Sequence, residues 1–177
     1  DKIPEKENLI LTVGRFSILP NGTDFKKLEF LAKAFKKFQK KRLKGWSMAI
    51  VTSVSPELKD KFSELEKKIK STHVKVYQNA SFDEIVSLYS KAKIYWHASG
   101  YKEDLDKYPE RAEHFGISTV EAMSYGQVPI VINAGGQPEI VIDCDNGFLW
   151  NTEEELISST HKVAIDKDLM KKISERA

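Results

Sequence analysis

The hydrophobic residues of this chain alternate between short continuous runs and a spacing of three to four residues. The run Leu9–Val13 ends at Gly14 and is typical of a strand that is buried on both faces. From Leu28 to Phe38, apolar residues recur three and four apart with lysines between them, which predicts an amphipathic helix. The first two predicted elements are therefore a buried strand and a helix that packs on it.

The same alternation continues along the rest of the sequence. Further strands are predicted at residues 48–51, 73–77, 93–97, 128–132 and 147–150. Further helices are predicted after Ser55-Pro56, after the capping boxes that begin at Ser81 and Thr152, and over residues 116–125. Because strands and helices alternate, we expect one α/β domain over residues 1–177. It is predicted to be a Rossmann-like three-layer domain, with a parallel sheet of about six strands and helices on both faces.

Composition and charge narrow the class of protein. The 177 residues are 41% hydrophobic, which suits one globular domain. With 28 Lys and Arg against 26 Asp and Glu, the net charge of +2 gives no reason to expect a nucleic-acid partner. The single cysteine, Cys144, cannot form an internal disulfide, so we expect a reducing, cytoplasmic location. No apolar run approaches the ~18 residues of a transmembrane segment, and the first residues lack the apolar core of a signal peptide.

The segments after the predicted strands are where chemistry is expected, because ligands bind at the carboxyl ends of the strands in an open parallel sheet. The longest of these segments spans residues 98–115, and long loops in compact domains are often functional. The sequence contains no Gly-x-Gly-x-x-Gly, Gly-Lys-Ser/Thr, His-Glu-x-x-His or Gly-x-Ser-x-Gly motif. Its 4 histidines lack the spacing of metal ligands, so no metal site is expected.

Two carboxylates flank the predicted start of a helix near Gly116. Glu113 lies just before this start, and Glu121 lies ~7 Å inside the helix at about 1.5 Å per residue. The free amides of a helix start bind phosphate, and each carboxylate can accept hydrogen bonds from two ring hydroxyls. The layout fits a nucleotide sugar, in which a diphosphate lies between two hydroxylated rings.

Two other interpretations of this pair stay open. Glu113 and Glu121 can be solvated surface side chains, as most glutamates are. They can also be the acid and base of a glycoside hydrolase, whose carboxyl groups lie about 5–10 Å apart. Spacing along the sequence does not decide between these interpretations.

Basic residues follow the first predicted strand. Gly14 and Arg15 come directly after it, and a guanidinium group suits phosphate oxygens. Lys26 or Lys27, at the start of the next helix, can supply a second positive charge. For the lysines, the alternative is a solvated helix face.

Small and polar residues follow two later strands. Asn79 and Ala80 come after the third strand, where they can meet the edge of a nucleotide base. Gly135 and Gly136 come after the fifth strand, where glycine permits a close backbone approach. A plain turn explains the two glycines equally well.

Taken together, these segments resemble the carboxyl-terminal domain of the family-4 retaining glycosyltransferases, which have the GT-B fold. The resemblance covers nearly the whole chain. It is carried by Val13–Phe16, Ser81–Tyr89, Glu113–Met123, Gly126–Pro129, Gly135–Val141 and Asn146–Leu149. Two glutamates eight positions apart, followed by Ala-Met and then by Gly-Gly-x-Pro-Glu, are specific in combination.

The resemblance implies roles for these residues. The family transfers a sugar from a nucleoside-diphosphate sugar without an obligatory metal, so a UDP- or GDP-linked donor and no cofactor are implied. By position, Glu113 resembles the contact to the donor sugar, Glu121 the ribose-binding carboxylate and Arg15 the phosphate-binding arginine. The backbone amides implied at the diphosphate are those of Phe115, Gly116 and Ile117. Asn21 stands where the family usually has its phosphate-binding lysine, which leaves Lys26 as the candidate.

The resemblance also implies a second domain. A GT-B enzyme reacts in the cleft between two Rossmann-like domains, and this chain resembles only the nucleotide-binding half. The acceptor, which is a glycan, a lipid or a small molecule, is then expected to bind to an absent N-terminal domain. The chain alone is expected to bind donor and to transfer no sugar. A nucleotide-sugar epimerase or hydrolase with the same fold and a non-catalytic nucleotide-binding module are the alternatives.

The lysine-rich segment 26–44 raises a further possibility, which is peripheral association of the intact protein with acidic lipids. Its regular apolar stripe is needed for packing on the sheet, however. A solvated helix face is therefore favoured over a membrane contact.

Overall fold

The computed structural model describes residues 5–40 and 45–177. The strands in these residues are β1 (Glu7–Arg15), β2 (Ser47–Ser53), β3 (Val74–Gln78), β4 (Ala92–His97), β5 (Val128–Ile132) and β6 (Phe148–Trp150). They form one six-stranded sheet in the order β3-β2-β1-β4-β5-β6, and every neighbouring pair is parallel. This arrangement confirms the predicted Rossmann-like fold.

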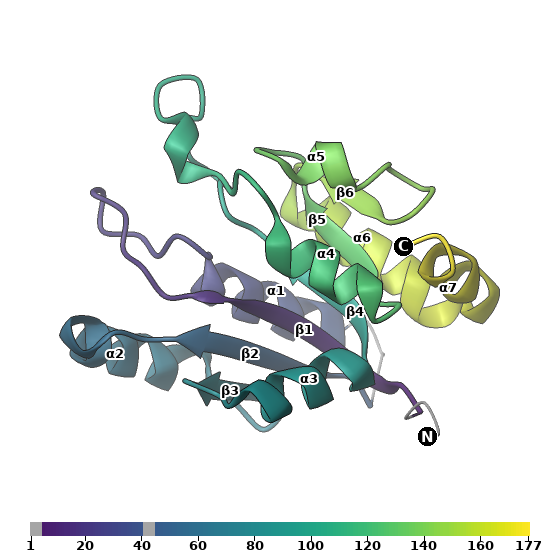
Figure 1. The fold of residues 1–177 in the computed structure, drawn as a ribbon, viewed down its shortest axis with the longest axis horizontal. Helices are drawn as coiled ribbons and strands as arrows, with labels where there is room; N and C mark the ends of the chain where they lie inside the picture. The colour runs from purple at the N-terminus through teal and green to yellow at the C-terminus, as the bar shows by residue number, and fades with distance from the viewer. Residues whose placement is uncertain (1–4, 41–44) are drawn as a thin grey trace.

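Helices cover both faces of the sheet. They are α1 (Leu28–Lys40), α2 (Lys59–Ile69), α3 (Phe82–Lys91), α4 (Ile117–Ser124), α5 (Gln137–Ile140), α6 (Glu153–Ile165) and α7 (Lys167–Ser174). Figure 1 shows α3 and α4 in front of the sheet and α1 and α6 behind it. The predicted three layers are therefore present.

Two clusters of buried side chains, one on each face, form the core. Alternate residues of one strand enter different clusters: Ile10 packs with α1, α2 and α6, whereas its neighbour Leu11 packs with α3 and α4. Trp96 and Tyr95 divide in the same way on β4. Because both faces are buried, the inner strands are largely apolar runs, whereas the edge strand β3 alternates, with Lys75 exposed between Val74 and Val76.

Most predicted elements are present, with shifted ends. Both predicted capping boxes form, at Ser81 with Glu84 and at Thr152 with Glu155. The helix expected at 116–125 is Ile117–Ser124, with Gly116 as its N-cap. The sequence pattern missed α5 and α7, because α5 is a single turn and α7 begins at the Asp166 cap directly after α6. The lysine-rich helix is described from Leu28 to Lys40, and residues 41–44 of that prediction lie outside the described residues.

The strand order also shows that the sheet is extended in opposite directions from the neighbouring strands β1 and β4. From β1 the sheet grows through β2 to β3 on one side and, starting from β4, through β5 to β6 on the other side. The loops that leave β1 and β4 project beyond the same edge of the sheet, at the left and upper left of Figure 1. This change of direction at the carboxyl ends of two neighbouring strands is the usual ligand position in such sheets.

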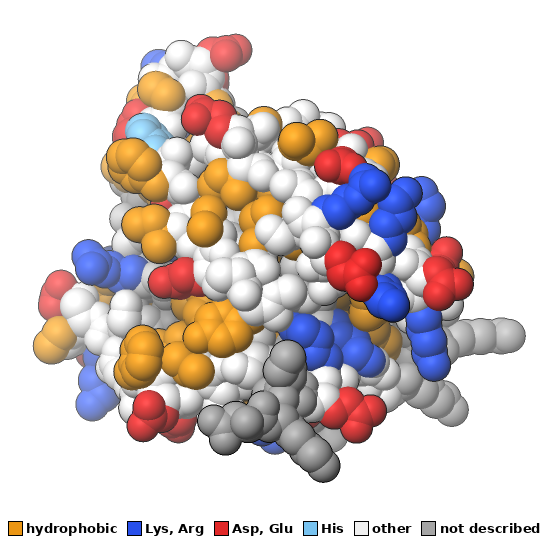
Figure 2. Space-filling model, turned by 45° about the vertical axis from the view of Figure 1, so that its right-hand side comes forward, with side chains coloured by type: hydrophobic (Ala, Val, Ile, Leu, Met, Phe, Trp, Pro, Cys, Tyr) orange, Lys and Arg blue, Asp and Glu red, His pale blue; other side chains and the backbone are white. Residues whose placement is uncertain are grey.

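The surface carries charges of both signs. Figure 2 shows lysine and arginine side chains interspersed with acidic ones at the right of this face, and exposed hydrophobic side chains mainly over its centre and left. Within the described part of the chain, no helix combines the length and the apolar character needed to span a bilayer.

Candidate functional site

A cavity of about 520 Å³ opens at the carboxyl edge of the sheet. It is lined by Val13, Gly14, Arg15, Val51, Thr52, Ser53, Asn79, Ala80, Ile85 and Glu121. The carboxyl ends of β1 and β2, the loop after β3 and the helices α3 and α4 contribute these residues, so the cavity unites side chains that are far apart in the sequence. Its volume lies within the range of ~300–1,000 Å³ that is typical of small-molecule sites.

Glu121 is held in this cavity by a tyrosine. The Tyr89 hydroxyl on α3 donates a hydrogen bond to Oε2 of Glu121 over 2.8 Å. The Tyr89 ring stacks on Tyr125 with 5.5 Å between the ring centroids, which fixes the direction of the hydroxyl. Burial, reinforced by neighbours that include Glu121, raises the pKa of Tyr89, so the phenol stays a donor.

The start of α4 is built around a glycine. Gly116 adopts a left-handed φ of 61°, and a Cβ there would lie 2.6 Å from Cδ1 of Ile140. One turn on, the buried Thr119 hydroxyl donates to Gln137 over 2.8 Å and anchors the helix. The side chains on either side of Gly116 point outward, with Phe115 78% exposed and Ile117 68% exposed. What this helix start offers to a ligand is therefore its backbone amides.

Lys26 and Glu113 lie next to the cavity. The Lys26 ammonium donates to Oε2 of Glu113 over 2.6 Å. Its side chain lies against Gly14, where an added Cβ would lie 2.4 Å from the lysine Cε and would displace the lysine from this position. Gly14 also lines the cavity, so the Lys26–Glu113 ion pair lies next to the space beside Arg15.

His97, the last residue of β4, lies behind the ion pair. Its Nε2 is 3.9 Å from the same Glu113 oxygen that Lys26 contacts, and its side chain is 1% exposed. The buried His97 ring and the Lys26 ammonium hold the pKa of Glu113 at about 2. Burial lowers the pKa of His97 itself, which favours the neutral imidazole. Among the described residues, neither ring nitrogen has a hydrogen-bond partner, a state that typically costs ~1–3 kcal/mol per group.

The backbone that carries Glu113 rests on the glycine pair. The Gly136 amide donates to the Glu113 carbonyl over 2.8 Å. A Cβ at Gly135 would lie 2.2 Å from the Glu113 carbonyl oxygen, and one at Gly136 would lie 2.0 Å from the His114 carbonyl oxygen. The two glycines therefore do more than form a turn, because they let the fifth strand's loop pack against the segment that carries Glu113.

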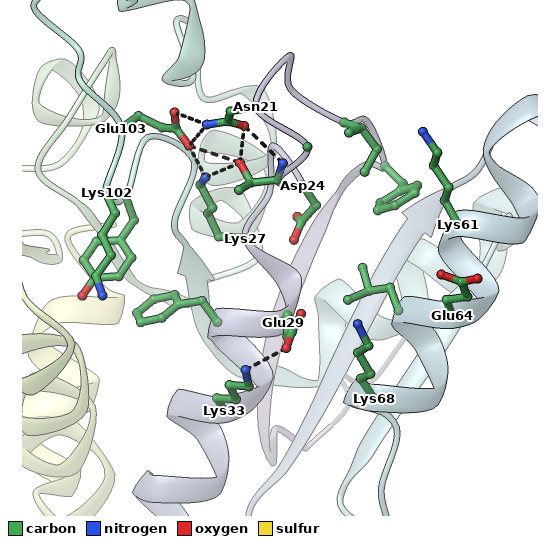
Figure 3. Close-up of a pocket in the computed structure, with 17 residues that line it drawn as sticks. Asn21, Asp24, Lys27, Glu29, Lys33, Lys61, Glu64, Lys68, Lys102 and Glu103 are labelled. Carbon is green, nitrogen blue, oxygen red and sulfur yellow. Dashed lines mark hydrogen bonds and ion pairs between the residues drawn. The ribbon is translucent and has the colours of Figure 1, made fainter.

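Lys27 belongs to a different site. A hollow of about 700 Å³ lies between α1, α2 and the loops after β1 and β4, and Figure 3 shows its lining side chains. There the Lys27 ammonium is 2.5 Å from Oε1 of Glu103. Because Lys27 is paired here, Lys26 is the lysine that reaches Glu113.

Glu103 ties the two projecting loops together. Its carboxylate also accepts hydrogen bonds from Arg111 over 3.0 Å and from Asn21 over 3.0 Å. Figure 3 shows Glu103 directed at Asn21 and Lys27, which belong to the loop after β1. Burial alone would raise the pKa of Glu103, but the donated hydrogen bonds outweigh it and hold the pKa at about 2. Asn21, at the family's usual lysine position, serves this contact between the loops.

Of the predicted site residues, Gly14, Arg15, Asn79, Ala80 and Glu121 line this cavity. Lys26 lies against Gly14 and contacts Glu113, which places these two beside it. Phe115, Gly116 and Ile117, at the start of α4, are not among its lining residues. Asn79 lies in it, but its side-chain amide is engaged with the backbone of Val54, from which it accepts a hydrogen bond over 2.9 Å. No group of three or more His, Cys, Asp or Glu side chains within residues 5–40 and 45–177 is placed to hold a metal ion.

Sequence reasoning missed three residues of the site and its surroundings. His97 carried a weak signal, because it is a polar residue that ends an apolar strand before the longest loop. Tyr89 lies in a segment of the family resemblance and Glu103 in the longest loop, but the sequence does not show their roles, since each acts through a partner that is distant in the sequence.

The fold and the cavity define a Rossmann-like α/β domain with a small-molecule site at the carboxyl ends of its strands. The family model of glycosyl transferases group 1 matches residues 1–177. The chain belongs to this family, within the GT-B glycosyltransferases.

Relatives and solved structures agree with this membership. The chain is 26% identical over 180 residues to a GDP-Man:Man(3)GlcNAc(2)-PP-Dol alpha-1,2-mannosyltransferase of Dictyostelium discoideum. The match covers 97% of this chain and 33% of that protein, so the chain spans a third of the relative's length. The C-terminal domain of the glycosyl transferase group 1 family protein LpcC from Francisella tularensis superimposes with a TM-score of 0.71 at 25% identity, over 98% of this chain and 83% of that one. Anabaena HepE, solved with UDP and glucose, has the same fold, with a TM-score of 0.70 at 23% identity over 93% of this chain and 41% of its own.

Proposed function

We propose that this chain is the donor-binding half of a retaining, family-4 hexosyltransferase that takes a UDP- or GDP-linked sugar. The observation that carries the proposal is the cavity of about 520 Å³ that brings Arg15 and Glu121 together beside the Lys26–Glu113 contact. In this proposal, the cationic groups and the helix amides bind the diphosphate, while Glu121 and Glu113 bind the sugar hydroxyls on its two sides, which is the order of groups in a nucleotide sugar.

Each residue then has a chemical role. Glu121 accepts hydrogen bonds from the ribose hydroxyls, and the backbone at Asn79 and Ala80 meets the base. Arg15, Lys26 and the amides at the start of α4 bind the diphosphate. Glu113 contacts the donor sugar on the reacting side.

In the transfer step, negative charge develops on the departing diphosphate. Preorganised donors that face this charge stabilise the transition state more than the ground state. Arg15, Lys26 and the α4 amides are such donors. In this proposal, these side chains and amides stabilise the departing diphosphate, and no metal or other cofactor takes part.

The acceptor is bound elsewhere in this proposal. Because the chain spans a third of the Dictyostelium relative, the acceptor glycan, lipid or small molecule is assigned to a further N-terminal domain. The chain alone then binds donor without transferring sugar. The GDP-Man in the name of the Dictyostelium relative and the UDP in the HepE structure support these two nucleotides as probes.

Calorimetric titration of the chain with UDP and with GDP tests the proposal. We expect one of them to bind, and Arg15→Met to weaken that binding by about tenfold, since a charge-assisted hydrogen bond contributes roughly 1.5–3 kcal/mol. Arg176→Met is the matched control, because Arg176 pairs with Asp145 and is not among the residues that line the cavity. If neither nucleotide binds, or if both variants behave alike, the assignment is wrong.

A further inference from the structure

One oxygen of Glu113 faces two nitrogen donors from different parts of the chain. Lys26 Nζ lies 2.6 Å from Oε2, and His97 Nε2 lies 3.9 Å from the same atom. Lys26 comes from the loop after β1, whereas His97 ends β4. The carboxylate therefore has a second donor in reach while the first one holds it.

The His97 ring is the part of this arrangement that the proposed function leaves unused. Its side chain is 1% exposed, and neither nitrogen has a hydrogen-bond partner among the described residues. Buried polar groups in folded proteins are almost always paired, so an unpaired one calls for an explanation. The charged groups that face it are Glu113 and Lys26.

The Lys26 side chain lies against Gly14, and Gly14 lines the cavity beside Arg15. A rotation of the lysine side chain would carry its ammonium from Glu113 toward that cavity. An anionic diphosphate in the cavity attracts the ammonium. Glu113 would then lose its present partner at the moment when it has to face the donor sugar.

We propose that His97 is a positioning residue that takes over the Glu113 carboxylate when the donor diphosphate draws Lys26 away. The His97 Nε2–H donates to Oε2 of Glu113 and keeps the carboxylate aimed at the sugar. The Lys26–Glu113 ion pair is the unliganded state of this exchange. This inference rests on the proposed function, because it needs the diphosphate to bind beside Arg15.

The test measures what the sugar adds to nucleotide binding. Calorimetry measures the affinity for the sugar nucleotide and for the nucleotide without the sugar, and the ratio of the two affinities is compared between variants. The pair is UDP-glucose with UDP or GDP-mannose with GDP, whichever the wild-type chain binds. In His97→Leu, the affinity for the sugar nucleotide relative to that for the nucleotide alone is expected to fall by about tenfold, which is the contribution of a hydrogen bond to a charged group. His97→Gln, whose amide can reach the Nε2 position, is expected to restore most of the ratio.

A second background shows whether His97 acts through Glu113. In Glu113→Ala, adding His97→Leu is expected to leave the ratio unchanged, since the carboxylate to be positioned is gone. Thr160→Val is a matched control, because Thr160 is a fully buried hydrogen-bonding residue on the α6 side of the sheet. It is expected to lower stability and to leave the ratio alone.

The outcomes separate the two proposals. A wild-type chain that binds no nucleotide overturns the proposed function itself. A chain that binds nucleotides, but whose ratio is unchanged in His97→Leu, overturns only the role of His97.

NMR of the wild-type imidazole nitrogens makes the test independent of how well the variants fold. The His97 Nε2 signal is expected to move toward a hydrogen-bonded position on addition of the sugar nucleotide. An unmoved signal at saturation overturns the role.

Discussion

The hydroxyl of Tyr89 lies 2.8 Å from Oε2 of Glu121, so a tyrosine of α3 orients a carboxylate of α4. The two residues are 32 positions apart, and Glu121 lines the cavity together with Arg15. When Glu121 binds the ribose hydroxyls as proposed, the orientation of its carboxylate depends on this one hydrogen bond.

Tyr89→Phe is therefore expected to weaken nucleotide binding by about tenfold, because it removes a hydrogen bond to a charged acceptor. The aromatic stack on Tyr125 stays, so the helix packing should persist. Calorimetry with the nucleotide checks the first point. With a 2′,3′-dideoxyribose analogue, which lacks both ribose hydroxyls that Glu121 is proposed to bind, wild type and variant should bind alike; an equal loss for both ligands would contradict this role.

Gly14→Ala tests the passage of Lys26. The new Cβ would lie 2.4 Å from the lysine Cε, a flexible atom that can move aside. We expect the free energy of unfolding to change by less than about 1 kcal/mol, while nucleotide affinity falls because Lys26 is displaced. Thermal unfolding and calorimetry measure the two effects. Gly22→Ala is the control: it has open space and a φ of 84°, so it should cost about 1 kcal/mol without a change in affinity.

Gly136→Ala meets a harder obstacle. Its Cβ would lie 2.0 Å from the His114 carbonyl oxygen, which is backbone and cannot turn away as the Lys26 side chain can. We expect a loss of about 1–3 kcal/mol of stability from overpacking, together with displacement of the segment that carries Glu113. Chemical denaturation measures the loss. A variant as stable as wild type would show that this loop yields more easily than its packing indicates.

Glu103→Gln tests the contact between the two projecting loops. Glu103 is 3% exposed, and its cationic partners Lys27 and Arg111 are 9% and 12% exposed. Removing the negative charge leaves two buried cations side by side, so we expect a loss of about 3 kcal/mol in a denaturation experiment at neutral pH. Glu29→Gln is the matched control, since its lysine partner is at the surface, and should change stability by less than about 0.5 kcal/mol.

Acid should weaken the same contact and the Lys26–Glu113 pair. The pKa of Glu103 and that of Glu113 are about 2 in the folded chain, below the ordinary value of 4.5. A lowered folded pKa adds stability that is fully present above pH 4.5 and is lost as the pH falls toward 2. Denaturation curves across this range should therefore show stability falling with acid. The fall should be shallower in Glu103→Gln, and an identical slope would contradict the assignment.

Much of the fold could be predicted because its signals are local. The run Leu9–Val13 and the capping box at Ser81 each depend on residues that are close in the sequence. The single turn α5 escaped prediction because four residues are too few to show a period. The left-handed backbone at Lys27 escaped it as well, since lysine carries no local preference for a φ of 56°.

The sequence by itself determined the alternation of strands and helices, the helix start at Gly116 and the two acidic residues that flank it. Hydrophobic period, glycine and capping chemistry act over a few residues, so they can be recognised without the fold. The packing of the layers determines that Lys26 and not Lys27 meets Glu113, that Tyr89 orients Glu121 and that His97, behind the ion pair, has no hydrogen-bond partner among the residues that the structure describes. Such contacts depend on distances of a few ångströms between side chains from different strands and helices, which the packing of the layers sets and the order of residues does not reveal.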